Sequence, residues 1–231
     1  MTMKELKDFY ITRYKNQDSS DCDRIIPNFL DNENIPKFSD DQKNLCEGIL
    51  SNTECFNALS KFPNGKTPGN DGLTPEFYRK FWNLLSQLMT DSLNFSYKYG
   101  ELSNSQKQAI IRSIEKKGKN RRYIKNWRPI SLLNVGTKIA SKALALRLER
   151  ILPFIINEDQ YAYVKSRTIF DAVRSIDDIM EYTRINQIPG LMVAIDSISW
   201  NFLLKALKSF NLGKSFIKWI SFILFYGYIL F

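Results

Sequence analysis

Residues 106–128 read QKQAIIRSIEKKGKNRRYIKNWR and carry more information on fold and function than any other stretch of the chain. The apolar residues at 108–114 predict a strand that leads into a basic run. Nine lysines and arginines occur here against one acidic residue, Glu115, and Tyr123 and Trp127 lie among them. This mixture is expected of a surface that holds phosphates and stacks on bases or sugars. A solvated basic loop or a nuclear localisation signal has the same composition, so both interpretations stay open.

The charge of the chain is unevenly distributed. The 231 residues have a formal net charge of +9, with seven basic and eleven acidic residues in positions 1–60 and 26 basic and 13 acidic residues beyond. Lysines and arginines that neutralise phosphates release counterions, so a positive balance favours polyanionic partners. A nucleic-acid surface is therefore expected beyond residue 60. The hydrophobic content of 44% is sufficient to bury a core.

The composition also excludes several classes of protein. The chain has no histidine and its cysteines, Cys22, Cys46 and Cys55, lack C-x-x-C spacing, so we expect neither a zinc site nor His-based catalysis. Charges interrupt the first residues, where a secretory signal needs an apolar run, so we expect an intracellular protein, nuclear or cytoplasmic, that is not secreted. The apolar tail at 216–231 contains Lys218 and is shorter than the ~20 residues of a spanning helix. We expect no membrane partner and a tail that stays partly uncovered.

The spacing of apolar residues predicts an α+β fold that is mostly helical. Thr74 and Pro75 mark the start of one helix as its cap and its first turn. An unbroken apolar run after Pro189 and Gly190 indicates a buried strand at 191–195. The predicted helices span residues 4–14, 54–62, 75–97, 138–151, 170–180 and 200–210, and the polar stretch 16–44 is predicted to be a connector.

Two short motifs outside the basic run admit a functional and a structural interpretation. Residues 66–72, KTPGNDG, would cradle a phosphate if their backbone N–H groups pointed at one anion, or they form a pair of turns. Asp196 ends the predicted strand at 191–195, a position suited to holding a catalytic metal ion. Asp196 or Ser197 would equally serve as the cap of the helix that follows.

Several segments follow one another in an order found in a known family. They are LCEG (45–48), KTPGNDGLTPEFYRKFW (66–82), IEKKGKNRRYIKNWRPISLLN (114–134), TKIASKALALRLERILPFII (137–156), DQYAYVKSR (159–167) and VAID (193–196). The series resembles the fingers and early palm of reverse transcriptases from non-LTR retrotransposons of the long interspersed type. The resemblance covers roughly residues 45–220, and residues 4–44 are similar to the connector between endonuclease and polymerase in such elements.

The resemblance implies a division of the chain into three parts. Residues 1–44 would form the connector, residues 45–190 the fingers, and residues 191–231 the truncated start of a ferredoxin-like palm. The implied activity is RNA-directed DNA synthesis on an RNA or DNA template–primer, with Mg²⁺ ions held by palm carboxylates. The oligomeric state stays open.

Individual residues match functional positions of the family. Lys117 and Lys119 match its basic finger strand, and Arg128 matches the arginine that grips the incoming triphosphate, a task suited to a planar guanidinium. The segment 165–167 matches the part that holds the template backbone, where Ser166 replaces the usual glycine. The expected nucleotide- and template-binding residues are Lys116, Lys117, Lys119, Arg121, Arg122, Arg128, Lys165 and Arg167.

Asp196 matches the first metal-binding aspartate of the palm and is the expected catalytic residue, but its surroundings depart from the family pattern. Several residues, including an aromatic one and a second aspartate, normally follow before the serine that starts the next helix. Here Ser197 follows directly, so Asp196 matches either aspartate. The chain also ends before the family's aromatic-Ala-Asp-Asp turn, and its Asp-Asp pairs are Asp40-Asp41 and the helical Asp177-Asp178.

The sequence therefore predicts a partial reverse transcriptase that is catalytically inactive as this chain. Two alternatives stay open. One is a non-catalytic module that binds RNA or template–primer, and the other is the non-functional product of a decayed element.

Overall fold

The computed structural model describes residues 4–5, 7–9, 30, 35–162, 164–189 and 199–228. Contacts between Cα atoms divide the chain into two compact units. The first unit comprises Met1–Gln17, Glu47–Leu146 and Gly213–Phe231, and the second comprises Asp18–Cys46 and Arg147–Leu212. Helices predominate among the described residues, and the described strands form one antiparallel sheet of two strands, in agreement with an α+β fold.

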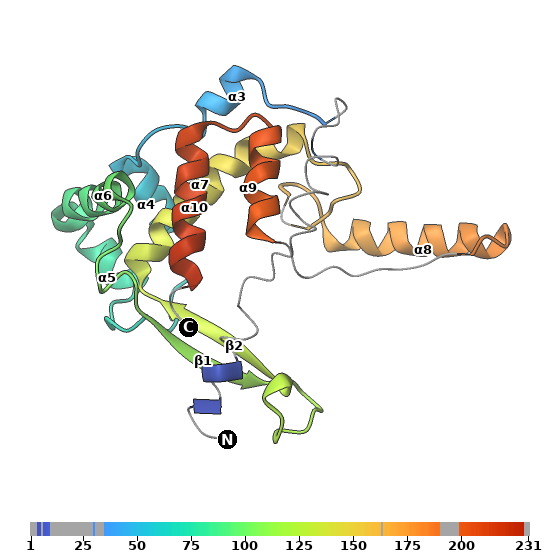
Figure 1. The fold of residues 1–231 in the computed structure, drawn as a ribbon, viewed down its shortest axis with the longest axis horizontal. Helices are drawn as coiled ribbons and strands as arrows, with labels where there is room; N and C mark the ends of the chain where they lie inside the picture. Colours follow the sequence, from blue (N-terminus) through green and yellow to red (C-terminus); the bar gives the residue numbers. More distant parts are fainter. Residues whose placement is uncertain are drawn as a thin grey trace. The chain divides into compact units, whose positions relative to one another are not determined.

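Most of the predicted elements are confirmed. The helices predicted at 54–62, 138–151, 170–180 and 200–210 correspond to α4, α7, α8 and α9, and the strand predicted at 108–114 corresponds to β1. The strand predicted at 191–195 lies outside the described residues. In chain order (Figure 1) the elements are α3 (Asp40–Asn44), α4 (Asn52–Ser60), α5 (Pro75–Lys80), α6 (Trp82–Tyr99), β1 (Ala109–Glu115), a 3-10 turn (Ile124–Asn126), β2 (Trp127–Leu133), α7 (Val135–Ile151), a second 3-10 turn (Leu152–Phe154), α8 (Ile169–Ile185), α9 (Trp200–Ser209) and α10 (Lys214–Tyr228).

Local sequence signals set the starts of α4 and α5. The Ser51 hydroxyl accepts the Glu54 amide at 3.2 Å and the Glu54 carboxylate accepts the Ser51 amide at 3.0 Å, a capping box that begins α4. Thr74 caps α5, as predicted. The single helix predicted at 75–97 is wrong in one respect. Phe81 leaves the helical conformation, with φ −103° and ψ 16°, and separates α5 from α6.

Helix α10 contains most of the apolar tail that was expected to stay partly uncovered, and two of its aromatic residues are buried. Trp219 is 0% exposed, as is Phe216, and the Trp219 ring stacks on Tyr97 of α6 with centroids 4.2 Å apart. The Glu47 carboxylate accepts the amides of Ser215 at 3.1 Å and Phe216 at 2.9 Å, which satisfies donors in the first turn of α10. Segments distant in sequence supply the surface that covers these two residues. Lys218 is exposed and the described side chains at 217 and 220–224 are half-buried, so the tail stays partly uncovered, as expected. Within the described residues, no helix is long and apolar enough to cross a membrane.

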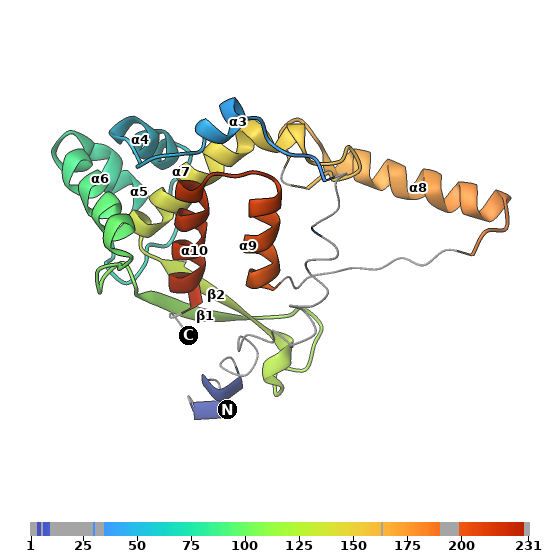
Figure 2. The ribbon, with the colours of Figure 1, turned by 45° about the horizontal axis from the view of Figure 1, so that its top comes forward.

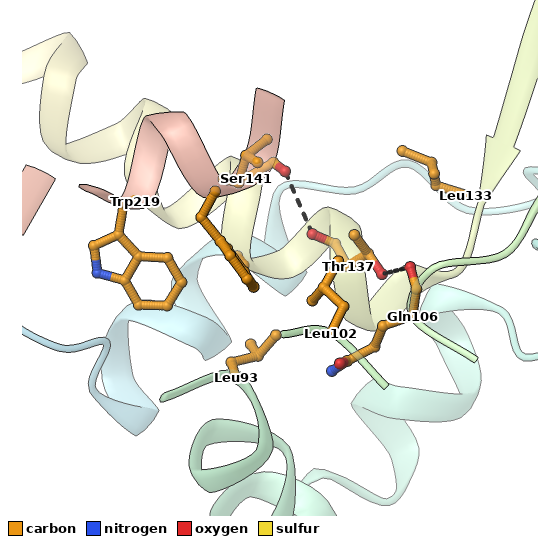
Figure 3. Close-up of a pocket in the computed structure, with 10 residues that line it drawn as sticks. Leu93, Leu102, Gln106, Leu133, Thr137, Ser141 and Trp219 are labelled. Carbon is orange, nitrogen blue, oxygen red and sulfur yellow. Dashed lines mark hydrogen bonds between the residues drawn. The ribbon is translucent and has the colours of Figure 1, made fainter. Parts of the chain in front are cut away.

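A small cavity of about 50 Å³ lies where α6, α7 and α10 meet. Figure 3 shows Leu93, Leu102 and Trp219 around this space. Its lining is mostly apolar, so the cavity is expected to hold no water. Leu133 at the end of β2 and Thr137 in α7 also line it, so the cavity lies between α10 and the junction of β2 and α7.

Part of the polar stretch 16–44 belongs to the core of the second unit. The Phe38 amide donates to the Phe210 carbonyl at 2.9 Å, and the Asn211 side chain donates to the Phe38 carbonyl at 3.0 Å. Phe38 is buried, and Leu30 joins an apolar cluster with α9. The few apolar residues in the described part of this stretch therefore pack against the region of α9.

Candidate nucleic-acid interface

The basic run forms a β-hairpin. Strands β1 and β2 pair antiparallel in a register that places Glu115 opposite Trp127. The Lys116 amide donates to the Asn126 carbonyl at 2.8 Å, which carries the pairing one step further toward the tip. Figures 1 and 2 show the hairpin reaching away from α5 and α6, with the basic tip at its far end. The run is therefore an ordered projection.

Alternation along the strands gives the hairpin two different faces. Glu115 and Trp127 lie on the half-buried face. Arg128, the expected phosphate-binding residue, lies on the exposed face together with Ile130. Arg112 is paired opposite Ile130 and shares this exposed face, although it was not among the predicted binding residues. That Arg112 and Arg128 share a face follows from the pairing register of the strands, which cannot be deduced from amino-acid composition.

The cations near the tip differ in how they are engaged. Arg121 forms an ion pair with Glu115, in which Nη2 lies 2.8 Å from Oε1. The Lys116 ammonium donates to the Lys125 carbonyl at 2.9 Å. The remaining predicted cations of the hairpin are exposed and, within the described part of the chain, have no acidic partner: Lys117, Lys119, Arg122 and Arg128.

The exposed aromatic ring of the tip belongs to Tyr123. The Trp127 indole N–H donates to the Arg121 carbonyl at 2.9 Å, and Trp127 is half-buried. Tyr123 is 57% exposed, and the Lys125 ammonium lies 5.6 Å from its ring centroid. Trp127 therefore shapes the tip, whereas Tyr123 is the ring available for stacking on a base.

Asn134, directly after β2, fixes the loop 66–72 to the base of the hairpin. Its Oδ1 accepts the Asp71 amide at 3.3 Å. Gly69 approaches so closely that a Cβ on Gly69 would lie 2.1 Å from this Oδ1 and 2.5 Å from the Asn134 amide nitrogen. The Gly72 amide donates to the Gly69 carbonyl at 3.2 Å. The Asp71 and Gly72 amides already have acceptors within the protein. The structure therefore favours the interpretation of residues 66–72 as turns rather than as a phosphate-binding nest.

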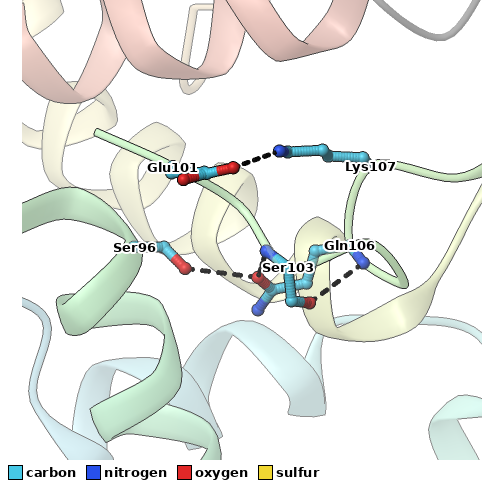
Figure 4. Close-up of polar contacts among 5 residues, drawn as sticks. All are labelled: Ser96, Glu101, Ser103, Gln106 and Lys107. Atoms are coloured by element: carbon cyan, nitrogen blue, oxygen red, sulfur yellow. Dashed lines mark hydrogen bonds and ion pairs between the residues drawn. The ribbon is translucent and has the colours of Figure 1, made fainter. Parts of the chain in front are cut away.

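A turn between α6 and β1 anchors the first strand at the same base of the hairpin (Figure 4). The buried Gln106 side chain accepts the Ser96 hydroxyl at 3.2 Å. The Thr137 hydroxyl in α7 donates to the Gln106 carbonyl at 3.1 Å. Lys107 hydrogen-bonds Glu101 at 2.8 Å and holds the pKa of that carboxyl below its ordinary value. These contacts attach the start of β1 to the neighbouring helices.

The second predicted template-binding segment, 165–167, lies in the second unit. Ser166 has a φ of 67°, in the left-handed region that favours glycine, which explains why glycine suits this position. The Arg167 guanidinium donates to the carbonyls of Ile156 at 3.2 Å and Gln160 at 2.7 Å. Arg167 therefore organises the loop before α8, and Lys165 is the exposed cation of the segment.

Asp196, the predicted catalytic and metal-binding residue, lies outside the described residues. Among the residues that the structure does describe, no group of three or more His, Cys, Asp or Glu side chains could hold a metal ion. Asp177 and Asp178 lie in α8, as their helical pattern predicted. The described residues by themselves do not fit a Mg²⁺ site.

Comparison with known proteins identifies one family and one relative. Residues 114–229, half of the chain, match the family model described as reverse transcriptase (RNA-dependent DNA polymerase). The chain is also 34% identical over 194 residues to the transposon TX1 uncharacterized 149 kDa protein of Xenopus laevis. That alignment covers 81% of this chain but 15% of the relative, so the chain corresponds to a small part of the larger protein.

Proposed function

Because the chain belongs to the reverse transcriptase (RNA-dependent DNA polymerase) family, we propose that it holds template–primer nucleic acid as the fingers portion of a non-LTR retrotransposon reverse transcriptase. The observation that carries this proposal is the ordered hairpin tip, where Lys117, Lys119 and Arg122 are exposed near Tyr123. Cations of this kind attract phosphates, and phosphate contacts position a strand without reading its sequence. An exposed ring adds stacking that tolerates any base.

The predicted site residues have different roles in this proposal. Arg128 would contact phosphate from the exposed face of the hairpin, and Lys165 would contact the template backbone from the second unit. Arg121 and Arg167 act by positioning, since their guanidinium groups are engaged within the protein. The family's chemistry uses Mg²⁺ ions held by carboxylates, and Asp196 is the residue of this chain proposed for that task.

We expect the 231-residue polypeptide to bind nucleic acid without extending a primer. Two metal ions about 3.5–4 Å apart need several carboxylates to hold them, and no acidic residue follows Asp196 in this sequence. Purified polypeptide with an annealed RNA template and DNA primer, deoxynucleotides and Mg²⁺ or Mn²⁺ should give no extended product on a denaturing gel. Extension that disappears in Asp196→Ala would contradict this expectation.

Removal of three tip cations by Lys117→Ala, Lys119→Ala and Arg122→Ala should weaken binding to single-stranded RNA and make it less sensitive to salt. Each phosphate of a single strand that the protein no longer neutralises lowers the slope of log affinity against log salt by about 0.7. Arg121 is retained because its side chain and its carbonyl hold the tip together. Fluorescence anisotropy of a labelled RNA at several salt concentrations measures both quantities.

The matched control removes three exposed lysines that lie outside the hairpin, Lys37, Lys61 and Lys80, and so changes the net charge equally. This control should keep the parent slope, because the three lysines lie outside the hairpin tip that carries the proposed phosphate contacts. Equal slopes for the parent, the tip variant and the control would mean that the tip is a solvated loop or a localisation signal.

A further inference from the structure

We infer that Arg112 joins Arg128 on the exposed face of the hairpin to form one site for two neighbouring phosphates. The inference rests on the proposed function, because it adds a residue and a ligand class to the same nucleic-acid surface. The ligand is either two successive phosphates of a single strand or two phosphates of a nucleoside triphosphate. Both present the same chemistry to a pair of guanidinium groups, and the experiment below separates them.

The strand register brings the two arginines together. Arg112 is paired opposite Ile130, and Arg128 is paired opposite Ile114, so the arginines occupy diagonal positions on one face. Diagonal neighbours of this kind have their side chains about 7–8 Å apart at the backbone end. Two long arginine side chains at that separation can both reach one diphosphate group or bridge consecutive phosphates of a strand. A pairing shifted by one residue would place the arginines on opposite faces.

The charge on this face favours an anion. Glu115, the acidic residue of the run, lies on the opposite face, where Arg121 neutralises it. Within the part of the chain that the structure describes, neither Arg112 nor Arg128 has an acidic partner. Guanidinium groups bind phosphate through paired hydrogen bonds and stay charged at every physiological pH. The two arginines are therefore available to an external phosphate.

The apolar neighbours of the arginines indicate that the ligand is more than a simple ion. Ile110, Ile114 and Ile130 are 43%, 45% and 41% exposed on this face. A sheet face that stays in water normally carries polar side chains, whereas this one alternates isoleucine with arginine. Isoleucine offers contact area to the apolar parts of a sugar or a base, while arginine takes the phosphate. A nucleotide or a nucleic-acid strand has both chemistries side by side.

The test compares Arg112→Gln, Arg128→Gln and the double variant in the full chain. Each single variant should lose about tenfold or more in affinity for a labelled single-stranded RNA, the loss expected for a hydrogen bond to a charged group. Each should also lower the salt slope by about 0.7. The double variant should lose less than the product of the single effects, because the two arginines share one ligand. Arg112→Lys should keep the salt slope of the parent because the charge is retained. Its affinity should lie between those of Arg112→Gln and the parent, since lysine cannot form paired hydrogen bonds with phosphate.

Arg174→Gln is the matched control, because Arg174 is an exposed arginine of α8 outside the hairpin and should bind as the parent does. Competition by inorganic tripolyphosphate distinguishes the two sources of phosphate. Loss of RNA affinity supports the strand as ligand, whereas loss of competition by tripolyphosphate with unchanged RNA affinity supports the triphosphate. The inference is overturned, and the proposed function stands, if Arg112→Gln equals Arg174→Gln in both RNA affinity and competition by tripolyphosphate while the tip variant weakens RNA binding. If the tip variant and Arg112→Gln both bind as the parent does, the proposed function fails as well.

Discussion

Replacement of Trp219 by alanine should lower the free energy of unfolding by about 3–5 kcal/mol, the range for large aromatic residues removed from a core. Trp219 is fully buried, its ring is nearly parallel to that of Tyr97 at an interplanar angle of 13°, and its indole N–H donates to the Gly48 carbonyl at 3.3 Å. The substitution would also enlarge the existing cavity of about 50 Å³, which adds to the cost. Urea unfolding followed by circular dichroism measures the change.

The comparison for Trp219→Ala is Leu84→Ala in α6, where the leucine is 75% exposed. A surface substitution of this kind should change the free energy of unfolding by about 0.5 kcal/mol or less. Similar unfolding curves for the two variants would show that α10 does not pack against α6 and α7 in solution. In that case Phe216 and Trp219 would belong to the uncovered part of the tail.

The helices of this chain could largely be predicted because their signals are local. In α7, Ile139 and Ala143 repeat at helical spacing and are buried as that spacing requires. Strand β2 could not be predicted in the same way, since Pro129 in its middle argues against a strand. In a two-stranded sheet each strand is an edge, and edge strands tolerate proline. The burial of Trp219 could not be predicted from local sequence either, because its partners Tyr97 and Gly48 lie far from it in the chain.

Composition predicted the chemical nature of the interface but not its geometry. The excess of lysine and arginine pointed to phosphate, whereas the pairing register decides that Arg112 shares a face with Arg128. The sequence also does not show which arginines are engaged by other groups of the same protein. Arg121 and Arg167 were expected to bind nucleic acid, yet the structure engages them with Glu115 and with backbone carbonyls. These intramolecular partners distinguish Arg121 and Arg167 from the hairpin cations that have no acidic partner within the described structure.

Substitution of Gly69 by alanine should destabilise the first unit by about 2–5 kcal/mol, because overpacking and the loss of a partly buried hydrogen bond act together. The added Cβ would lie 2.5 Å from the Asn134 amide nitrogen and 2.7 Å from its Cα, and backbone atoms cannot move aside as a flexible side chain does. The loop would have to leave Asn134 and lose the bond from the Asp71 amide. Thermal unfolding measures the difference from the parent.

Gly72→Ala separates this steric effect from backbone strain. Gly72 has a φ of 70° with open space around its Cβ position, so alanine there should cost only the left-handed conformation, about 1–2 kcal/mol. Gly69→Ala should be the more severe variant. It should also weaken RNA binding without changing the salt slope, because Asn134 supports the base of the hairpin while every phosphate-binding cation is retained. A cost for Gly69→Ala no larger than that for Gly72→Ala would mean that the loop does not pack against Asn134. A reduced slope would mean that the loop itself supplies a phosphate contact.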